Sequence, residues 1–337
     1  MSLKIGPNIV VSPARRADIE NLYLTSYTYS QLNSTPGNEV GDMSYCSDAY
    51  GGDGAIVIWN GNDWFRSTAT GGNQYQIGEY IYHVYTSPGN FNVQNTSTTV
   101  ENFIISGGGG GGSGTGGNGG GGAGGYILTS AQTLNPGTYP VVVGSGGAAS
   151  TKGQDSSFNS ISVEGGGKAN GGPGACGGGA KGPNTNRGDG SIGFPGGGKV
   201  PGGNQSSGSS SSGGGGGGMS SAGATGGDEA NGRAGGQGIT IEPGWSVPTT
   251  YMPSTEVCGG GGGGGSRNGP QKPYNGGPGG SGGGANGGRN RFPQSTTANS
   301  AQSRGSGGGG AGDGTGGSGS DGIVVIRYQR SPKEITT

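Results

Sequence analysis

Short segments rich in aromatic and β-branched residues recur along the first half of the chain, and each is bounded by polar turn residues. Residues 80–86, 90–95 and 100–106 have this composition. Ser87-Pro88-Gly89 and residues 96–99 separate them as turns. Runs of this length and composition between turn signals predict β-strands. Residues 80–106 are therefore expected to fold as three consecutive strands.

The same pattern continues at wider spacing through the rest of the chain. Residues 126–129 and 139–144 form a predicted pair of strands around Asn135-Pro136-Gly137. Residues 157–163 follow as one predicted strand, and residues 322–328 (GIVVIRY) close the chain as the last. Because the region between is rich in glycine, we expect a β-sandwich whose first and last strands bracket it.

The first 75 residues have an ordinary composition and predict a separate module. Residues 42–45 and 55–59 are predicted strands, and Asn60-Gly61 is a hairpin turn that leads into a return strand over 63–67. Residues 14–24 could form one or two helical turns. The core of this module is predicted to contain three aromatic residues: Trp59, Trp64 and Phe65.

Glycine accounts for 92 of the 337 residues. Most of it lies in tracts at residues 107–125, 165–182, 213–218, 259–265, 276–288 and 305–319. A polyproline II helix has three residues per turn and no internal hydrogen bonds, so its N–H and C=O groups point outward. Only glycine lets such helices approach closely enough to exchange these bonds, which predicts a polyglycine II bundle.

Two local patterns fit such a bundle, in which exposed residues should recur at every third position. Asn170, Pro173 and Cys176 have this spacing, and so do Thr315, Ser318 and Asp321. Ordering glycine costs more backbone entropy than ordering any other residue, so bonds between helices must offset that cost. Flexible glycine linkers are the alternative interpretation.

Composition and charge narrow the classes of function. Hydrophobic residues are 26% of the chain, well below the roughly 45–50% of globular proteins, and the net charge is −1. Without a basic surface, nucleic acid is not an expected partner. Apolar segments are too short for membrane insertion. Residues 1–16 lack the apolar region of a signal peptide, which predicts no leader.

Few residues offer catalytic or metal-binding chemistry. The single histidine, His83, lies in a predicted strand, where a histidine is usually structural. No Ser-His-Asp or Cys-His-Asn triad is available that does not use this residue. The three scattered cysteines form neither a disulfide framework nor a zinc motif. One match to a calcium-binding nonapeptide at residues 316–324 is expected by chance in so glycine-rich a chain. We therefore expect no catalytic residues, no metal and no cofactor.

Four segments resemble, in sequence and in order, the glycine-rich domains of bacteriophage tail-fibre and tail-tip proteins. They are residues 83–112 (HVYTSPGNFNVQNTSTTVENFIISGGGGGG), 124–147 (GGYILTSAQTLNPGTYPVVVGSGG), 154–167 (QDSSFNSISVEGGG) and 319–328 (GSDGIVVIRY). Residues 41–66 resemble, more weakly, small β-modules of phage tail proteins. The resemblance covers roughly residues 80–328.

The resemblance implies an all-β protein in four parts. These are an N-terminal attachment module (1–75), a β-sandwich neck with the first glycine tract (76–164), a polyglycine II bundle with variable loops (165–321) and a closing strand with a tail (322–337). It also implies a place in the virion tail after assembly in the host cytoplasm. The first module would bind other tail or fibre proteins, with Trp59, Trp64 and Phe65 as attachment residues.

Loops between the glycine tracts would then contact a bacterial surface receptor, either a polysaccharide or an outer-membrane protein. Aromatic residues suit this task because they provide large contact area at little entropic cost. The candidates are Trp245, Tyr251, Met252, Tyr274, Arg289, Arg291, Phe292 and Phe194. Packing of these aromatics as a cap on the bundle is the competing interpretation. For the whole chain, the alternatives are a structural tail subunit and, more remotely, an ice-binding protein.

Overall fold

The protein is described here from a computed structural model, which covers residues 68–94, 97–181, 190, 212–225, 231–265, 274–289 and 297–329, with Gln31 and the strands of the first 67 residues. The chain divides into two compact units, Met1–Thr68 and Ala69–Thr337. The fold is all-β, as the sequence predicts, with strands arranged in several mainly antiparallel sheets.

The described strands of the first unit form two small sheets. Strands β1 (Leu3–Ile5) and β2 (Ile9–Val11) pair antiparallel. A second sheet has the order β3-β4-β5-β6, with bounds Ser26–Tyr27, Met43–Cys46, Ala55–Trp59 and Trp64–Phe65. The predicted hairpin is present, because β5 and β6 pair antiparallel with Trp59 opposite Trp64. The predicted helical turns at residues 14–24 lie outside the described residues.

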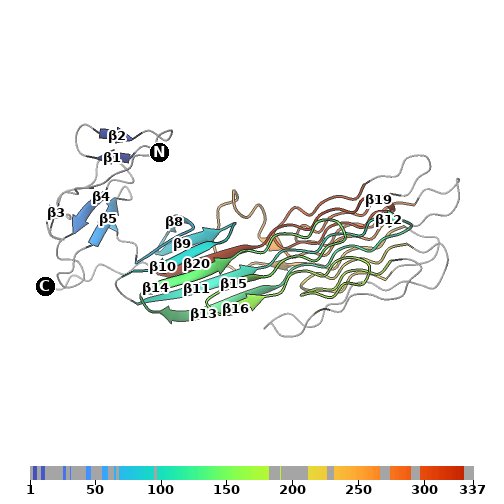
Figure 1. Cartoon of the computed structure of the whole chain (residues 1–337), viewed down its shortest axis with the longest axis horizontal. Coiled ribbons are helices and arrows are strands. Elements are labelled where there is room, and N and C mark those ends of the chain that lie inside the picture. The colour runs from blue at the N-terminus through green and yellow to red at the C-terminus, as the bar shows by residue number, and fades with distance from the viewer. Residues whose placement is uncertain are drawn as a thin grey trace. The chain divides into compact units, whose positions relative to one another are not determined.

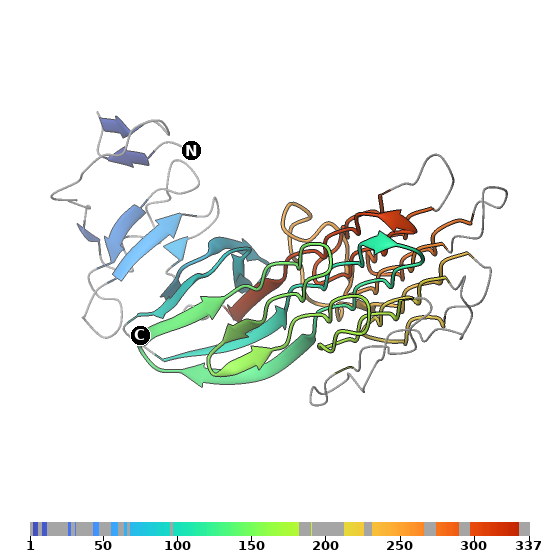
Figure 2. The ribbon, with the colours of Figure 1, turned by 45° about the vertical axis from the view of Figure 1, so that its right-hand side comes forward.

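The second unit begins with a β-sandwich of two five-stranded sheets (Figures 1 and 2). One sheet has the order β16-β15-β14-β10-β7, with bounds Ile161–Val163, Ser156–Phe158, Gly137–Val142, Gly89–Val93 and Ala69–Thr70. The other has the order β13-β11-β20-β9-β8, with bounds Tyr126–Leu134, Thr98–Ile105, Ile323–Gln329, Tyr80–Tyr85 and Asn73–Ile77. The closing strand β20 lies between β11 and β9, inside its sheet.

Two predicted strands differ from the observed ones. Residues 157–163 are not one strand but the hairpin β15–β16, which turns at Asn159 (φ 45°) and Ser160 (φ 65°). A left-handed turn without glycine gives little sequence signal. Strand β13 runs on to Leu134, five residues beyond its predicted end at 129. It does so around an irregularity in its pairing with β11 between Val100 and Asn102.

Aromatic rings from the two sheets form the interior of the sandwich. Phe91 of β10 meets His83 of β9 edge to face at a centroid distance of 5.0 Å, and meets Phe158 of β15 in the same way at 5.8 Å. Phe91 and His83 have no exposed surface. Phe91 and Phe158 belong to the same sheet, so it is the contact between Phe91 and His83 that holds one sheet against the other.

The glycine tracts extend from the sandwich as helices that are joined by backbone hydrogen bonds. Gly109, Gly110 and Gly111 donate their N–H groups to three different segments, at Gly122, Thr151 and Gly317. Gly112 then donates to Gly119, which belongs to the first of these segments again. A period of three with bonds only to neighbours is the geometry of a polyglycine II helix.

The central tract repeats this geometry with other neighbours. Gly120, Gly121 and Gly122 donate to Gly214, Gly308 and Gly167, and Ala123 returns to Gly217 in the first of those segments. A Cβ atom built on Gly121 would overlap the carbonyl group of Gly109. The structure therefore has an ordered bundle in these tracts, and a side chain at Gly121 would collide with the backbone of the neighbouring helix.

Of the two predicted three-residue patterns, one describes an exposed helix face and the other does not. Thr315 and Asp321 are exposed and Ser318 is half-buried. The pattern at Asn170 and Cys176 is wrong, because the chain turns at Gly171 (φ 92°) and Cys176 is fully buried. A spacing of three carries no information where a turn interrupts the helix.

Candidate functional site

Three of the predicted receptor-contact residues, Trp245, Tyr251 and Met252, belong to a loop that lies on the sandwich. This neck loop, residues 241–255, is closed at its base by the antiparallel pair β17 (Ile239–Thr240) and β18 (Glu256–Val257). Its Trp245 ring meets Phe103 at 4.9 Å and Tyr82 at 6.2 Å, both on the outer face of the β13-β11-β20-β9-β8 sheet. The loop therefore covers an apolar sheet face.

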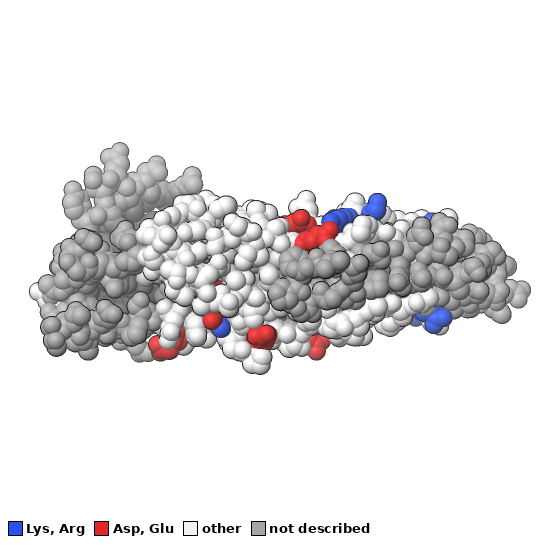
Figure 3. Space-filling view, turned by 90° about the horizontal axis from the view of Figure 1, so that it is seen from below, with Lys and Arg blue, Asp and Glu red and all other residues white. Residues whose placement is uncertain are grey.

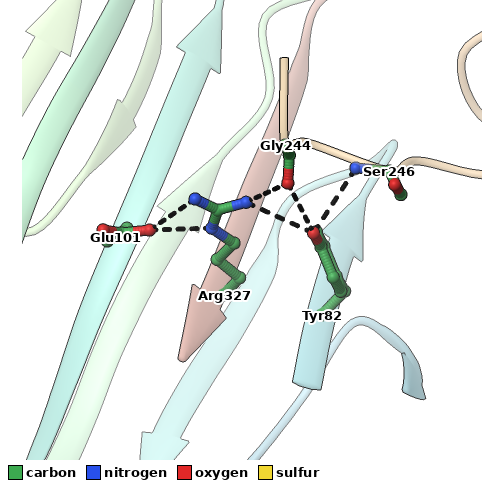
Figure 4. A network of polar contacts seen from close by, with 5 residues as sticks. All are labelled: Tyr82, Glu101, Gly244, Ser246 and Arg327. Atoms are coloured by element: carbon green, nitrogen blue, oxygen red, sulfur yellow. Dashed lines mark hydrogen bonds and ion pairs between the residues drawn. The ribbon is translucent and has the colours of Figure 1, made fainter. Parts of the chain in front are cut away.

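A polar network centred on Arg327 of β20 fixes the neck loop (Figure 4). The guanidinium group donates through Nε and Nη2 to Glu101 Oε2, each at 2.7 Å. Its Nη1 donates to the Tyr82 hydroxyl at 3.3 Å and to the carbonyl oxygen of Gly244. The Tyr82 hydroxyl in turn accepts the Ser246 N–H at 3.4 Å.

Ring contacts complete this anchor. The Arg327 guanidinium carbon lies 3.9 Å from the Trp245 ring centroid and 4.4 Å from that of Tyr80. Stacking of a cation on an aromatic face adds roughly 0.5–2 kcal/mol per contact, depending on exposure. The side chain of Arg327 is only 11% exposed. The charge is thus paired with Glu101 and used to hold the loop.

Three parallel tyrosine rings continue from the network toward the surface. Tyr75 stacks on Tyr82 at 5.5 Å and on Tyr251 at 6.3 Å, with interplanar angles of 5° and 4°. Desolvation, and then the neighbouring Tyr82 and Tyr251, raise the pKa of Tyr75 above its usual value. Tyr251 is the outermost ring of the three and remains half-buried.

These contacts leave little of the predicted neck-loop residues for a receptor. Trp245 is 8% exposed and Met252 is 3% exposed, and both belong to the cluster beneath the loop. Their expected receptor role therefore has no surface to act through. The competing interpretation is right that these side chains are packed, but Trp245 packs on the sandwich sheet and not as a cap on the bundle. Of the three neck-loop candidates, Tyr251 alone is half-exposed.

Two other candidates, Tyr274 and Arg289, lie together at the end of the bundle away from the sandwich. The Gly265 N–H donates to the carbonyl oxygen of Gly288, directly before Arg289. A Cβ atom on Gly265 would meet the Tyr274 carbonyl oxygen. Tyr274 is half-buried and Arg289 is exposed. The candidates thus belong to two separate places along the second unit.

For the remaining predicted site residues, the structure describes no side-chain surroundings. Phe194, Arg291 and Phe292 lie outside the described residues. For the attachment residues the structure describes only strands: Trp59 pairs with Trp64, and Phe65 with Ile58. Their role in attachment remains a prediction.

Buried ionisable groups show no activated nucleophile among the described residues. Burial raises the pKa of Cys176 to about 12, and burial together with Cys176 raises the pKa of Cys258 well above its usual value. Both thiols therefore stay protonated at neutral pH. Within the described ranges, no three His, Cys, Asp or Glu side chains come together as a metal site would require.

The part of the chain that the structure describes has no apolar helix of the length that a bilayer crossing requires.

The sequence analysis did not single out Arg327, although this residue organises the neck loop. Its only signal was a charged residue inside the otherwise apolar run 323–328 (IVVIRY), where a buried charge needs a partner.

With this geometry established, comparison with known proteins defines the class of the chain. A family model described as a glycine-rich domain matches residues 86–329. The match includes most of the sandwich and the whole bundle, so the chain belongs to this glycine-rich domain family. A search of curated proteins finds no significant match.

Proposed function

We propose that this protein is a receptor-binding component of a bacteriophage tail fibre or tail tip. The order of strands and glycine tracts supports this proposal, because it is the order in which the sequence resembles phage tail domains. The matched family region, residues 86–329, coincides with those segments. Residues 1–75 would attach the protein to other tail proteins, and the bundle would present its distal end to the bacterial surface.

The observation that carries the proposal is the continuity of the hydrogen-bonded bundle up to Tyr274 and Arg289. Gly262, Gly263 and Gly264 donate to Ala285, Arg233 and Asn118, so three neighbours hold the last turn before Gly265. A surface held in place before binding loses little conformational entropy when a receptor binds. A rigid scaffold that displays a few bulky side chains suits recognition of a polysaccharide or an outer-membrane protein.

The test is attachment of the fluorescently labelled full chain to a panel of bacterial isolates. In an isolate that binds, we expect a Tyr274→Ala/Arg289→Ala variant to lose at least about tenfold in affinity, as for contact residues worth more than 1 kcal/mol. Tyr139→Ala, which changes a half-buried tyrosine on strand β14 of the sandwich, is the control and should bind normally. Thermal unfolding would confirm that both variants are folded.

Two results would oppose the proposal at different levels. Binding to no isolate, together with assembly of the chain into larger oligomers, would favour a structural subunit without receptor contact. Normal binding by the distal double variant would instead show that the receptor contacts another surface.

A further inference from the structure

A groove on the flank of the bundle is lined by two lysines. Its volume is about 380 Å³, within the range of small-molecule sites. It is lined by Ser150, Thr151, Lys152, Lys168, Gly172 and Pro173. Charged residues are 11% of the chain. On the face of the molecule that Figure 3 shows, most of the described surface is uncharged. Two ammonium groups in one groove are therefore distinctive.

The two walls of the groove are held at a fixed separation. One contains Thr151, whose carbonyl oxygen accepts the Gly110 N–H at 2.9 Å. The other contains Ala169, whose N–H donates to the carbonyl oxygen of the same Gly110 at 3.0 Å. A bond from Gly172 N–H to the Lys168 carbonyl oxygen at 3.0 Å closes the second wall. Because one glycine joins both walls, the groove is formed before any ligand binds.

The charges of the groove are available to an anion. Lys168 is exposed, and none of the six lining residues is acidic. Lys152 Nζ lies 2.5 Å from Glu164 Oε1, but this pair is at the surface, with side-chain exposures of 43% and 29%. Exposed ion pairs are worth only about 0–1 kcal/mol, so a ligand anion can replace Glu164. The other nearby carboxylate, Asp155, accepts the Gly165 N–H at 2.8 Å.

We propose that this groove binds an anionic sugar unit of a surface polysaccharide. The acidic group of the sugar would lie between the Lys152 and Lys168 ammonium groups. It would accept charge-assisted hydrogen bonds from them, which are stronger than hydrogen bonds between neutral groups. The Ser150 and Thr151 hydroxyls would meet sugar hydroxyls, and Pro173 would pack against the apolar face of the ring. The inference rests on the proposed function and names its ligand class. A sugar carboxylate and a sugar phosphate share this chemistry.

The test is a calorimetric titration of the full chain with a galacturonate trisaccharide, a hexose 6-phosphate and a neutral hexose trisaccharide. We expect one or both anionic sugars to bind, with an affinity that falls as salt is added. Lys152→Gln and Lys168→Gln should each weaken binding by about tenfold or more, the value of a charge-assisted hydrogen bond. Glu164→Gln should strengthen it, because the competing carboxylate is removed.

Lys181→Gln is the matched control, since it removes the same charge outside the groove and should leave the affinity unchanged. Equal binding of the neutral trisaccharide, or an equal loss with Lys181→Gln, would overturn the proposal. Failure of both anionic sugars to bind would also overturn it. If the labelled chain still attaches to cells in that case, the receptor-binding function stands and only the groove assignment fails.

Discussion

His83 shows how a single residue can be structural in a chain with so little side-chain chemistry. Its ring has no exposed surface and stacks on Tyr328 at 5.6 Å. Nδ1 lies 2.6 Å from the Gly71 carbonyl oxygen, so Nδ1 carries the donated proton, while Nε2 has no hydrogen-bond partner. Burial lowers the pKa of His83 to about 4, although the bond to Gly71 opposes that shift.

We predict that His83 makes folding sensitive to acid. Its folded pKa lies below the unfolded value of 6.5, so the unfolded chain takes up a proton first. Stability is then complete above about pH 6.5 and decreases as the pH falls toward 4, by about 3 kcal/mol in total. Urea unfolding between pH 7.5 and 4 measures this loss. The variant His83→Gln should show a shallower dependence, and equal slopes would contradict the assignment.

The glycine helix is the element that the sequence predicts best in kind. A tract without Cβ atoms can pack only through its backbone, and the period of three follows from the helix itself. The neck loop is the element it predicts least well. Whether Trp245 faces a receptor or caps the sandwich depends on which sheet face is left bare, and local composition does not record that.

For the helices, we predict a sharp contrast between interior and exposed positions. Gly121→Ala places a methyl group against the Gly109 carbonyl, and overpacking of this kind costs about 1–3 kcal/mol or more. Thr315→Ala changes an exposed position of another helix and should stay within about 0.5 kcal/mol of the parent. Chemical unfolding of both variants measures the difference. Equal stabilities would mean that the helices are not closely packed.

Considered as a whole, the second unit joins a sandwich with a conventional core to a bundle with almost none. Strand β11 leads directly into the tract that starts at Gly107 (Figure 1). Ser106 sits at this junction, where its hydroxyl accepts the Gly125 N–H at 2.8 Å and donates to the Glu164 carbonyl oxygen at 2.5 Å. The sandwich thereby sets the starting register of neighbouring helices.

We predict that amide exchange in the bundle is slow despite its glycine content. The N–H groups of Gly120–Gly124 are all bonded to neighbouring segments, so exchange requires opening of the bundle. Hydrogen-exchange mass spectrometry should show protection there comparable with that of strand β11. Ser221 and Ala222, at a turn of the bundle where their N–H groups donate no backbone bond to a described neighbouring helix, provide an internal reference for faster exchange. Exchange of the tract at the rate of an unstructured peptide would exclude the bundle.

Patterns that repeat locally were readable without coordinates: most strands of the sandwich, the hairpin around Asn60-Gly61 and the glycine helices. Each depends on a residue and its close neighbours in the chain. The partners of each helix were not readable, because identical glycines carry no side chains that distinguish one neighbour from another. Long-range packing also separated Trp245 and Met252, which are buried, from Tyr274 and Arg289, and brought Lys152 and Lys168 to one groove.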